Sequence, residues 1–135
     1  MKSIVIDAII ENLPKVMEFI DINLEEAECN MKAQTQIEIS VEELFVNIVN
    51  YAYEGKVGKA EITYEYSDKP KNVKIQLIDS GVPYNPLAKD DPDITLSVDE
   101  REIGGLGIFM VKKNMDDVQY DYIDGQNITT IFKNI

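Results

Sequence analysis

Residues 60–79, AEITYEYSDKPKNVKIQLID, decide the fold class, because their hydrophobic pattern has the period of a β-strand. Apolar side chains recur at every second position in two runs, as they do in strands that bury one face. These positions are Ile62, Tyr64 and Tyr66 in the first run and Val73, Ile75 and Leu77 in the second. The polar SDKPKN stretch between the runs is typical of a loop, so the segment predicts a β-hairpin.

The residues before this hairpin have a helical period instead. One apolar stripe runs through residues 13–29 and a wider one through residues 37–52, and both stripes predict amphipathic helices. We expect Asn12 to cap the first helix, with Pro14 in its first turn, where a missing N–H costs nothing. Gly55 is expected to end the second helix.

The remaining segments complete a predicted α+β architecture. Residues 3–10 are rich in β-branched side chains and predict a first strand, and residues 104–115 predict a short helix with a glycine-rich start. Two further strands are expected at residues 118–122 and 128–133, joined by a tight turn. This order predicts a two-layer α/β sandwich, in which helices cover one face of a mostly antiparallel or mixed sheet.

Composition narrows the possible functions. The chain has 135 residues, which fits one domain spanning residues 1–135. Its formal net charge of −12 argues against binding nucleic acid or an anionic membrane, whose phosphates need lysine and arginine. The absence of histidine excludes histidine-based catalysis, and the single cysteine, Cys29, excludes an intramolecular disulfide. Without an apolar run of about 20 residues or a signal peptide, we expect a soluble cytoplasmic protein.

Three short segments depart from what packing alone requires, and the first lies in the second helix. Glu43 and Asn47 are four residues apart and share a helix face, and Asn50 lies near it. Asparagine is a poor residue in mid-helix, because its amide competes for backbone hydrogen bonds. A carboxylate and an amide oxygen placed in this way would hold Mg²⁺ and orient a water or hydroxyl. The alternative is an ordinary solvated helix face.

The other two segments are rich in turn residues. Residues 79–83, DSGVP, place a carboxylate at a strand end, where it would accept a hydrogen bond from an exocyclic amine; they also fit a plain turn. Residues 104–107, GGLG, precede a helix whose first N–H groups would bind an anion; they also fit a glycine-rich entry turn. Taken in order along the chain, the three segments would supply a metal-binding site, a base-binding site and a phosphate-binding site.

At these residues the chain resembles the GHKL superfamily of ATP-binding domains, which have the Bergerat fold. It is most similar to the branch of small anti-sigma-factor serine kinases. The family's N box is matched by residues 43–47, its first glycine box by residues 79–83 and its second by residues 104–109. The resemblance extends over nearly the whole chain, and it implies ATP and Mg²⁺ as cofactors.

The resemblance also implies roles for individual residues. Glu43 would be the general base that polarises the attacking hydroxyl, Asn47 would ligate the Mg²⁺ bridging the phosphates, and Asp79 would accept the adenine amino group. Gly81 would let adenine lie flat, under an ATP lid of about residues 84–103. The other expected contacts to ATP are Asn50, Pro83, Arg101, Gly104, Gly105, Leu106, Gly107 and Thr130. For the position near adenine on the last strand, Asn127 is the alternative to Thr130.

By this resemblance the protein would be a Mg-ATP-dependent serine/threonine protein kinase and an anti-sigma regulatory factor. It would phosphorylate a serine of a STAS-type antagonist, sequester a sigma factor and form a homodimer. The main alternative is a non-catalytic switch or protein-interaction module of the same fold, in which ATP is only a conformational ligand. Glu43 favours the kinase. The acidic lid favours the module, as does Tyr51, which stands where these kinases commonly carry histidine.

Overall fold

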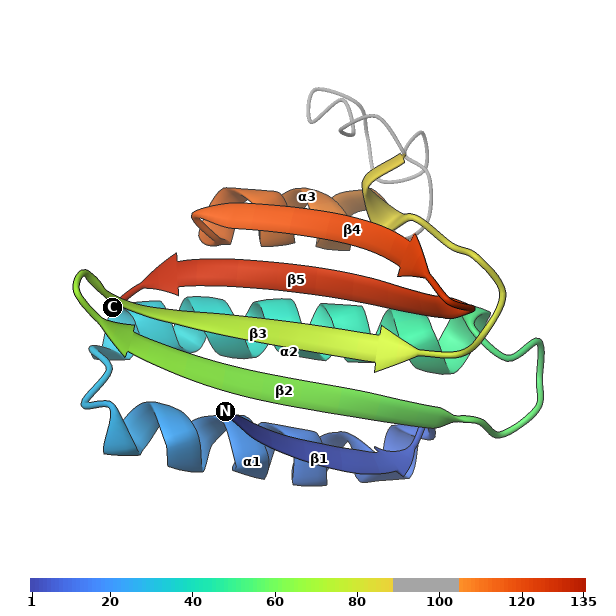
Figure 1. The fold of residues 1–135 in the computed structure, drawn as a ribbon, viewed down its shortest axis with the longest axis horizontal. Helices are drawn as coiled ribbons and strands as arrows, with labels where there is room; N and C mark the ends of the chain where they lie inside the picture. Colours follow the sequence, from blue (N-terminus) through green and yellow to red (C-terminus); the bar gives the residue numbers. More distant parts are fainter. Residues whose placement is uncertain (89–104) are drawn as a thin grey trace.

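The computed structural model describes residues 1–88 and 105–135, and within them five strands form one antiparallel sheet with three α-helices on one side (Figure 1). The strand order in the sheet is β1-β2-β3-β5-β4. In chain order the elements are β1 (Lys2–Asp7), α1 (Leu13–Glu26), α2 (Met31–Tyr51), β2 (Lys59–Asp68), β3 (Lys71–Asp79), α3 (Gly105–Asn114), β4 (Asp117–Ile123) and β5 (Gln126–Asn134). Short 3-10 helices, Ile10–Asn12 and Pro86–Ala88, precede α1 and follow β3.

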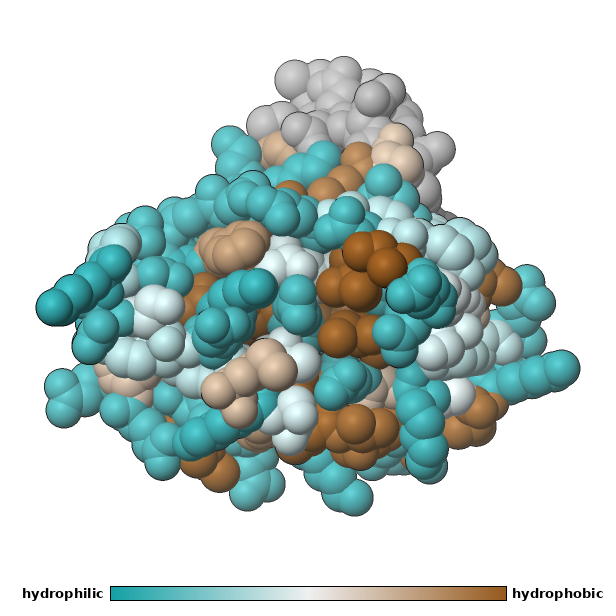
Figure 2. All heavy atoms as spheres, viewed as in Figure 1, coloured by the Kyte–Doolittle hydropathy of each residue, from teal (hydrophilic) through white to brown (hydrophobic). Residues whose placement is uncertain are grey.

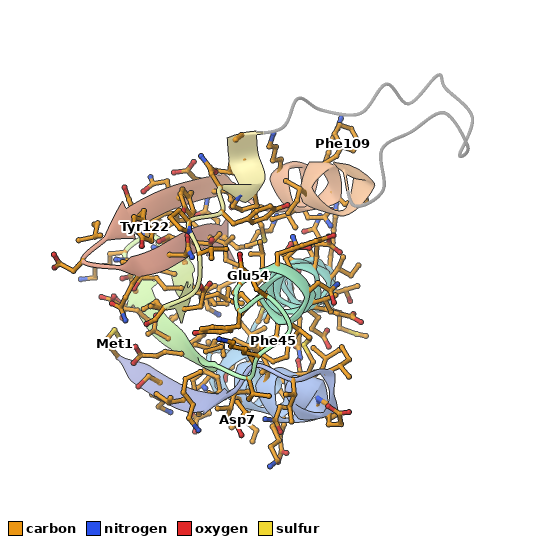
Figure 3. All side chains as sticks on the ribbon, turned by 90° about the vertical axis from the view of Figure 1, so that its right-hand side faces the viewer. Met1, Asp7, Phe45, Glu54, Phe109 and Tyr122 are labelled. Atoms are coloured by element: carbon orange, nitrogen blue, oxygen red, sulfur yellow. The ribbon has the colours of Figure 1, made fainter. Side chains whose placement is uncertain are left out.

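The hydrophobic core lies between the sheet and the helices. Figure 3 views the molecule along the sheet and shows the strands on one side, the helices on the other and Phe45 of α2 between them. Phe45, Ile75 and Leu77 are all buried in this core. Each such side chain stabilises the fold by about 1.5–3 kcal/mol when it leaves water. The alternating pattern of the sequence therefore points the predicted apolar positions of β3 toward the helices.

The helix-facing side of the paired strands β3 and β5 continues to one end of the sheet. Leu77 lies opposite Thr129, and two residues further along Asp79 lies opposite Asn127. Because successive side chains of a strand point to opposite faces, all four share the face that packs against the helices. The core therefore ends in a buried polar pair, in which Asp79 is 6% and Asn127 4% exposed.

The predicted α+β sandwich and the β2–β3 hairpin are confirmed, and four local expectations are wrong. The second helix ends at Tyr51, before the predicted stop at Gly55. The first strand ends at Asp7, earlier than its β-branched run suggests. Asn12 stands at the N-cap position of α1, but its side chain makes no capping hydrogen bond; its Nδ2 donates instead to the backbone carbonyl of Asp7 at 2.9 Å, which ties β1 to the start of α1. The second helix begins before the apolar stripe, and Asn30 caps it by accepting a hydrogen bond from Ala33 N at 2.8 Å.

The outer face of the sheet, which points away from the helices, carries scattered hydrophobic side chains among hydrophilic ones (Figure 2). On this face Ile78 lies opposite Ile128, and Gln76 lies opposite Thr130. In the part of the chain that the structure describes, no helix is both long and apolar enough to cross a membrane. The polar groups that end the core lie on the opposite face of the sheet, and the candidate site is built there.

Candidate functional site

A pocket opens at the end of the sheet, beside the C-terminal half of α2. The polar side chains that line it are Asn47, Asp79, Asn127 and Thr129. Its other walls are apolar or aromatic and come from α2, β3 and the loop after β3. A few convergent polar groups on apolar walls are the usual form of a small-molecule site.

Among the described residues that line this pocket, Asp79 contributes the one carboxylate. Its Oδ1 accepts hydrogen bonds from the Gly81 backbone N–H and from Asn127 Nδ2, both at 2.9 Å. Within residues 1–88 and 105–135, its Oδ2 has no hydrogen-bond partner. One oxygen is therefore used to hold the carboxylate in place, and the other remains for a donor that enters the pocket.

Asn127 connects Asp79 to the loop that follows β3. Besides its bond to Asp79, its Nδ2 donates to the Val82 carbonyl at 2.8 Å. Its Oδ1 accepts from the Tyr84 backbone N–H at 3.0 Å and from the Tyr120 hydroxyl. An amide has two N–H donors and two acceptor lone pairs, so the hydrogen-bonding capacity of Asn127 is fully used.

Two aromatic residues stack at the rim of the pocket. The rings of Tyr51 on α2 and Tyr84 in the loop after β3 have centroids 5.2 Å apart and planes inclined by 21°. Offset stacking at this separation is favourable beyond simple burial. Tyr51, which stands where the resembling kinases commonly carry histidine, therefore forms part of an aromatic wall.

Tyr53 holds the end of α2 against the sheet. Its hydroxyl donates to the Lys59 carbonyl and accepts from the Ser80 backbone N–H at 2.9 Å. Burial raises the pKa of this hydroxyl, so Tyr53 stays protonated and able to donate at neutral pH. Gly58 lies against the ring, where an added Cβ would be 2.2 Å from its carbon atoms. Tyr53 thereby braces the segment that begins with Ser80.

Gly81 lies directly on the backbone at the C-terminus of α2. A Cβ added there would be 2.1 Å from the Ala52 carbonyl oxygen, and the next residue, Val82, donates its N–H to that oxygen at 2.8 Å. Only glycine permits this approach of two backbones. The family resemblance implied that Gly81 lets adenine lie flat, and packing against α2 already requires a glycine at this position.

Glu43 lies one helical turn before Asn47, against the start of α3. A Cβ added to Gly107 would be 2.1 Å from Glu43 Oε1, so this glycine lets α3 approach α2 closely. Burial, and to a smaller extent the charge of Glu42, raises the pKa of Glu43. Within the described segments, no hydrogen bond or ion pair holds its carboxylate. A carboxylate with a raised pKa and no partner is suited to accept a proton.

Glu43 and Asn47 line two different hollows of the molecular surface. Glu43 borders a groove between α2 and α3, together with Ile39, Val46 and Met110. Asn47 lines the pocket instead. Because the two residues are four apart on one helix, this face of α2 joins the pocket to the groove.

The described residues contain no group of three or more His, Cys, Asp or Glu side chains that would hold a metal ion by themselves. A Mg²⁺ ion shared with a nucleotide does not need such a group, because it takes most of its oxygen ligands from phosphates and water. The half-buried Asn47 amide in the pocket supplies an oxygen donor of the kind Mg²⁺ prefers. The residues present therefore fit a nucleotide-bound Mg²⁺ ion.

Several predicted contacts to ATP are not brought to the pocket. Thr130 lies on the outer face of the sheet, where its Oγ1 accepts a hydrogen bond from Gln76 Nε2 at 3.2 Å. Asn50 and Pro83 are exposed and do not line the pocket. Four predictions fall wholly or partly outside what the structure describes: most of the lid at residues 84–103, Arg101, Gly104 and the side chain of Leu106.

Sequence reasoning also missed residues that the fold places in the pocket. Thr129 lines it, because on β5 the odd-numbered residues share the face of Asp79, and Tyr84 and Pro86 line it from the loop after β3. Because side chains alternate along β5, Thr130 lies on the opposite face from Asn127, Thr129 and Ile131. No comparable signal in the sequence marks Tyr84 or Pro86.

The fold and the pocket define a class of protein, the α+β sandwich domain with a small-molecule pocket at one end of its sheet. Residues 6–133 match the family of histidine kinase-like ATPase domains. The chain belongs to this family.

Named relatives agree with this assignment. The chain is 28% identical over 101 residues to the serine-protein kinase RsbW of Listeria monocytogenes serovar 1/2a, a match that covers 72% of this chain and 64% of that protein. It is 31% identical over 97 residues to the serine-protein kinase RsbW of Bacillus cereus (strain AH187), covering 68% of this chain and 59% of that protein. The matches therefore span less than two thirds of the length of either relative.

A solved structure shares the fold. The crystal structure of the RsbU and RsbW domains of Rv1364c from Mycobacterium tuberculosis superposes with a TM-score of 0.69. The superposition covers 99% of this chain and 32% of that chain, at 17% sequence identity. The predicted fold class, an α+β sandwich of the Bergerat type, is confirmed by this likeness.

Proposed function

We propose that the protein is a Mg-ATP-dependent serine/threonine protein kinase that acts as an anti-sigma regulatory factor. Its substrate would be a serine of a STAS-type antagonist protein, and the same domain would sequester a sigma factor. Membership of the histidine kinase-like ATPase family supports ATP as the ligand, and the likeness to serine-protein kinases RsbW supports the reaction. We further propose a single domain over residues 1–135 with a lid at about 84–103, which acts in the cytoplasm as a homodimer and does not bind nucleic acid or membranes.

The observation that carries the proposal is the difference between the two oxygens of the Asp79 carboxylate. Two protein N–H groups hold Oδ1, while Oδ2 is left for an amine in a pocket with aromatic and apolar walls. The amino group of adenine is such a donor, and the flat base suits such walls. From there the phosphates would extend along α2 toward Asn47 and the start of α3.

The second end of the site would serve phosphoryl transfer. Asn47 would bind a Mg²⁺ ion, whose charge would offset that of the phosphates. The first free backbone N–H groups of α3, a helix that begins at Gly105, would bind phosphate oxygens. The positions that the resemblance assigns to phosphate binding thus adjoin Glu43, because Gly107 packs directly against it.

Glu43 would act as the general base. A serine hydroxyl entering from the groove between α2 and α3 would lose its proton to the Glu43 carboxylate as its oxygen bonds to the γ-phosphorus. The bond from that phosphorus to the β–γ bridging oxygen would break, and ADP would leave. The raised pKa of Glu43 suits this role, because it brings the basicity of the carboxylate closer to that of a base working near neutral pH.

Calorimetry with Mg-ATP tests the nucleotide site. We expect wild-type protein to bind Mg-ATP. Asp79→Ala should lose most of this affinity, because it removes the base acceptor, and Asn47→Ala should bind more weakly than wild type, because it removes a metal ligand. The exposed Asn30→Asp change at the far end of α2, which retains its capping oxygen, is a matched control and should bind as wild type. No binding by wild-type protein at millimolar nucleotide would contradict the proposal.

Phosphoryl transfer needs its own assay. STAS-type proteins from the same genome would be incubated singly with the protein and ATP labelled at the γ-phosphate, and the label would be sought on serine. Transfer that disappears in Glu43→Gln, with ATP binding intact, would support the kinase. Binding without transfer to any of these proteins would leave the non-catalytic switch as the function.

A further inference from the structure

Another pocket lies between the C-terminal end of α1 and the first two strands, at the opposite end of the sandwich from Asp79 (Figure 1). Two strands and one helix contribute to it: Lys2 of β1, Tyr64 and Tyr66 of β2, and Asn23, Glu26 and Ala27 of α1. None of these described residues lines the pocket that contains Asp79. What this second pocket binds is therefore a question separate from the nucleotide.

Asn23 is a polar residue at the edge of the core, and it is only 4% exposed. Its Nδ2 donates to the backbone carbonyl of Phe19, one turn earlier in α1, at 2.8 Å. Its Oδ1 is buried and has no hydrogen-bond partner among residues 1–88 and 105–135. Because a buried acceptor without a donor is costly and uncommon, the fold leaves a position that a donor from outside the chain would fill.

The other polar groups that β2 and α1 contribute to this pocket are acceptors as well. The Tyr64 hydroxyl uses its proton to bond the backbone carbonyl of Asn23, at 3.2 Å. Burial raises the pKa of Tyr64 to about 12, so the hydroxyl stays neutral at pH 7 and its lone pairs remain for a donor. Glu26 adds a carboxylate. Amide, hydroxyl and carboxylate oxygens in one pocket favour a ligand with several N–H groups and a positive charge.

One cation of the chain already lies beside these acceptors. Lys2 Nζ donates to Glu26 Oε2 at 2.7 Å, and the two side chains are 56% and 63% exposed. An ion pair as exposed as this one contributes little to stability, so a cation that gains further contacts in the pocket can displace Lys2. The ring of Tyr66, which is 40% exposed, is a further attraction, because cations bind to aromatic faces.

We propose that this pocket binds a guanidinium group, the head of an arginine side chain. A guanidinium is flat and carries five N–H donors, so its narrow edge suits the nearly closed position at Asn23 while its remaining donors bond the Glu26 carboxylate. An anion would meet that carboxylate and the amide oxygen, and is disfavoured. The formal net charge of −12 adds a general attraction for cationic ligands. The proposal is independent of the proposed function, because the two pockets share no residue.

The experiment is a titration with N-acetyl-L-arginine amide, followed by NMR at the side-chain amide of Asn23 and the backbone amides of Tyr64 and Tyr66. We expect saturable shifts at these residues, with a dissociation constant of about 1 mM, as suits a single side chain. N-acetyl-L-citrulline amide has the same length without the charge, and it should bind at least about tenfold more weakly. Free L-arginine distinguishes the source of the group: comparable affinity indicates an arginine carried by a protein, and much tighter binding indicates the free amino acid.

Four variants test the individual contacts. Asn23→Leu removes the unpartnered oxygen, and affinity for the arginine probe should fall by about tenfold. Glu26→Gln removes the carboxylate and should weaken binding by about two- to fivefold, whereas Lys2→Met removes the competing cation and should strengthen binding by a similar factor. Glu25→Gln makes the same loss of charge on an exposed neighbour outside the pocket, and its affinity should equal that of the wild type.

The outcomes decide the proposal whatever the nucleotide experiments show. A wild-type protein without saturable shifts at these residues holds only water in the pocket, and this result overturns the proposal. Equal binding of the citrulline probe, or weaker binding of the arginine probe by Lys2→Met, also overturns it. Thermal unfolding shows whether each variant is folded. If Asn23→Leu does not fold, the two exposed positions decide, and unchanged affinity in both Glu26→Gln and Lys2→Met overturns the proposal.

Discussion

The two ends of the candidate site differ in how firmly their side chains are held. At the base end, Asp79 and Asn127 are buried and hydrogen-bonded to each other and to the loop after β3. At the catalytic end, Glu43 and Asn47 are only half-buried. In the segments that the structure describes, neither of these two side chains has a hydrogen-bond partner.

This difference matches what each end would have to do. A group that recognises a base gains affinity when it is fixed before the ligand arrives, because no ordering is then needed on binding. A general base and a metal ligand acquire their partners from the nucleotide, the ion and the acceptor hydroxyl. Fixed and open groups in one site therefore predict that mutations at the two ends have separable effects.

The largest expected effect is on the chemical step. Glu43→Gln keeps the shape of the side chain and removes its basicity, so phosphoryl transfer to a STAS-type substrate should fall by about 10²–10⁴-fold. ATP affinity should stay near that of the wild type, because Glu43 lies outside the base pocket. Single-turnover transfer and calorimetry measure the two quantities, with the exposed Glu25→Gln on α1 as control. Equal losses of rate and affinity would break the proposed separation of the two ends.

The next effect is on nucleotide affinity. Asp79→Ala removes the acceptor for the base and leaves an Asn127 N–H without its partner, so ATP should bind about 100-fold more weakly. Asp7→Ala, which removes a carboxylate from the ion pair with Lys59, makes the same truncation outside the pocket. Calorimetry should find its ATP affinity unchanged. If Asp79→Ala binds ATP with wild-type affinity, Asp79 does not recognise the base.

Alanine substitutions at two glycines, one at each end of the site, should lower the stability of the fold by different amounts. Gly81→Ala drives a Cβ into the rigid backbone at Ala52 and should destabilise the fold by about 1–3 kcal/mol. Gly107→Ala meets the side chain of Glu43, which can turn away, so the loss of stability should be smaller while transfer suffers. Chemical denaturation ranks the two variants, and the reverse ranking would show that the catalytic end is the more rigid one.

The smallest expected effect is a shift with pH. The pKa of Glu43 is raised above the ordinary value of 4.5. As the solution is acidified, the rate of phosphoryl transfer should therefore begin to fall while the pH is still above 4.5. Glu42→Gln removes one cause of the raised pKa, so this acid limb should move to lower pH. A pH–rate profile of the two proteins measures the displacement, and an acid limb that does not move would exclude Glu43 as the group that titrates.

The same pKa sets the sign of a stability effect. Between the ordinary and the raised pKa, the folded state binds more protons than the unfolded state, so stability falls as pH rises through that interval. At neutral pH the ionised Glu43 therefore costs stability. Glu43→Gln should unfold at a higher temperature than the wild type at pH 7, and a lower unfolding temperature would show that the carboxylate is held by partners in solution.

Much of the fold could be predicted because it depends on local periodicity. The alternation in residues 60–79 and the apolar stripe of residues 37–52 each bury one face, and each pattern fixes its own secondary structure. The misplaced start of α2 shows the limit of this reasoning. A helix extends as far as its cap, Asn30, and not only as far as its buried stripe.

The candidate site was predicted unevenly for a similar reason. Asn47 stands out because asparagine is unusual in mid-helix and lies four residues after Glu43, and Asp79 stands out because it ends an apolar strand. These departures can be read along the chain. Asn127 and Thr130 could not be ranked from the sequence. Their difference is one of sheet face, which depends on the register of β5 against β3.

The sequence by itself therefore determined the order of the elements, their amphipathic faces and the polar residues that interrupt those faces. Only the tertiary structure decided which of those residues meet. Asp79 and Asn127 are far apart in the chain and are brought together by strand register, and Gly81 reaches Ala52 through the packing of a loop on a helix end. Local pattern follows from the period of each element, whereas contacts between elements depend on how all of them pack around one core.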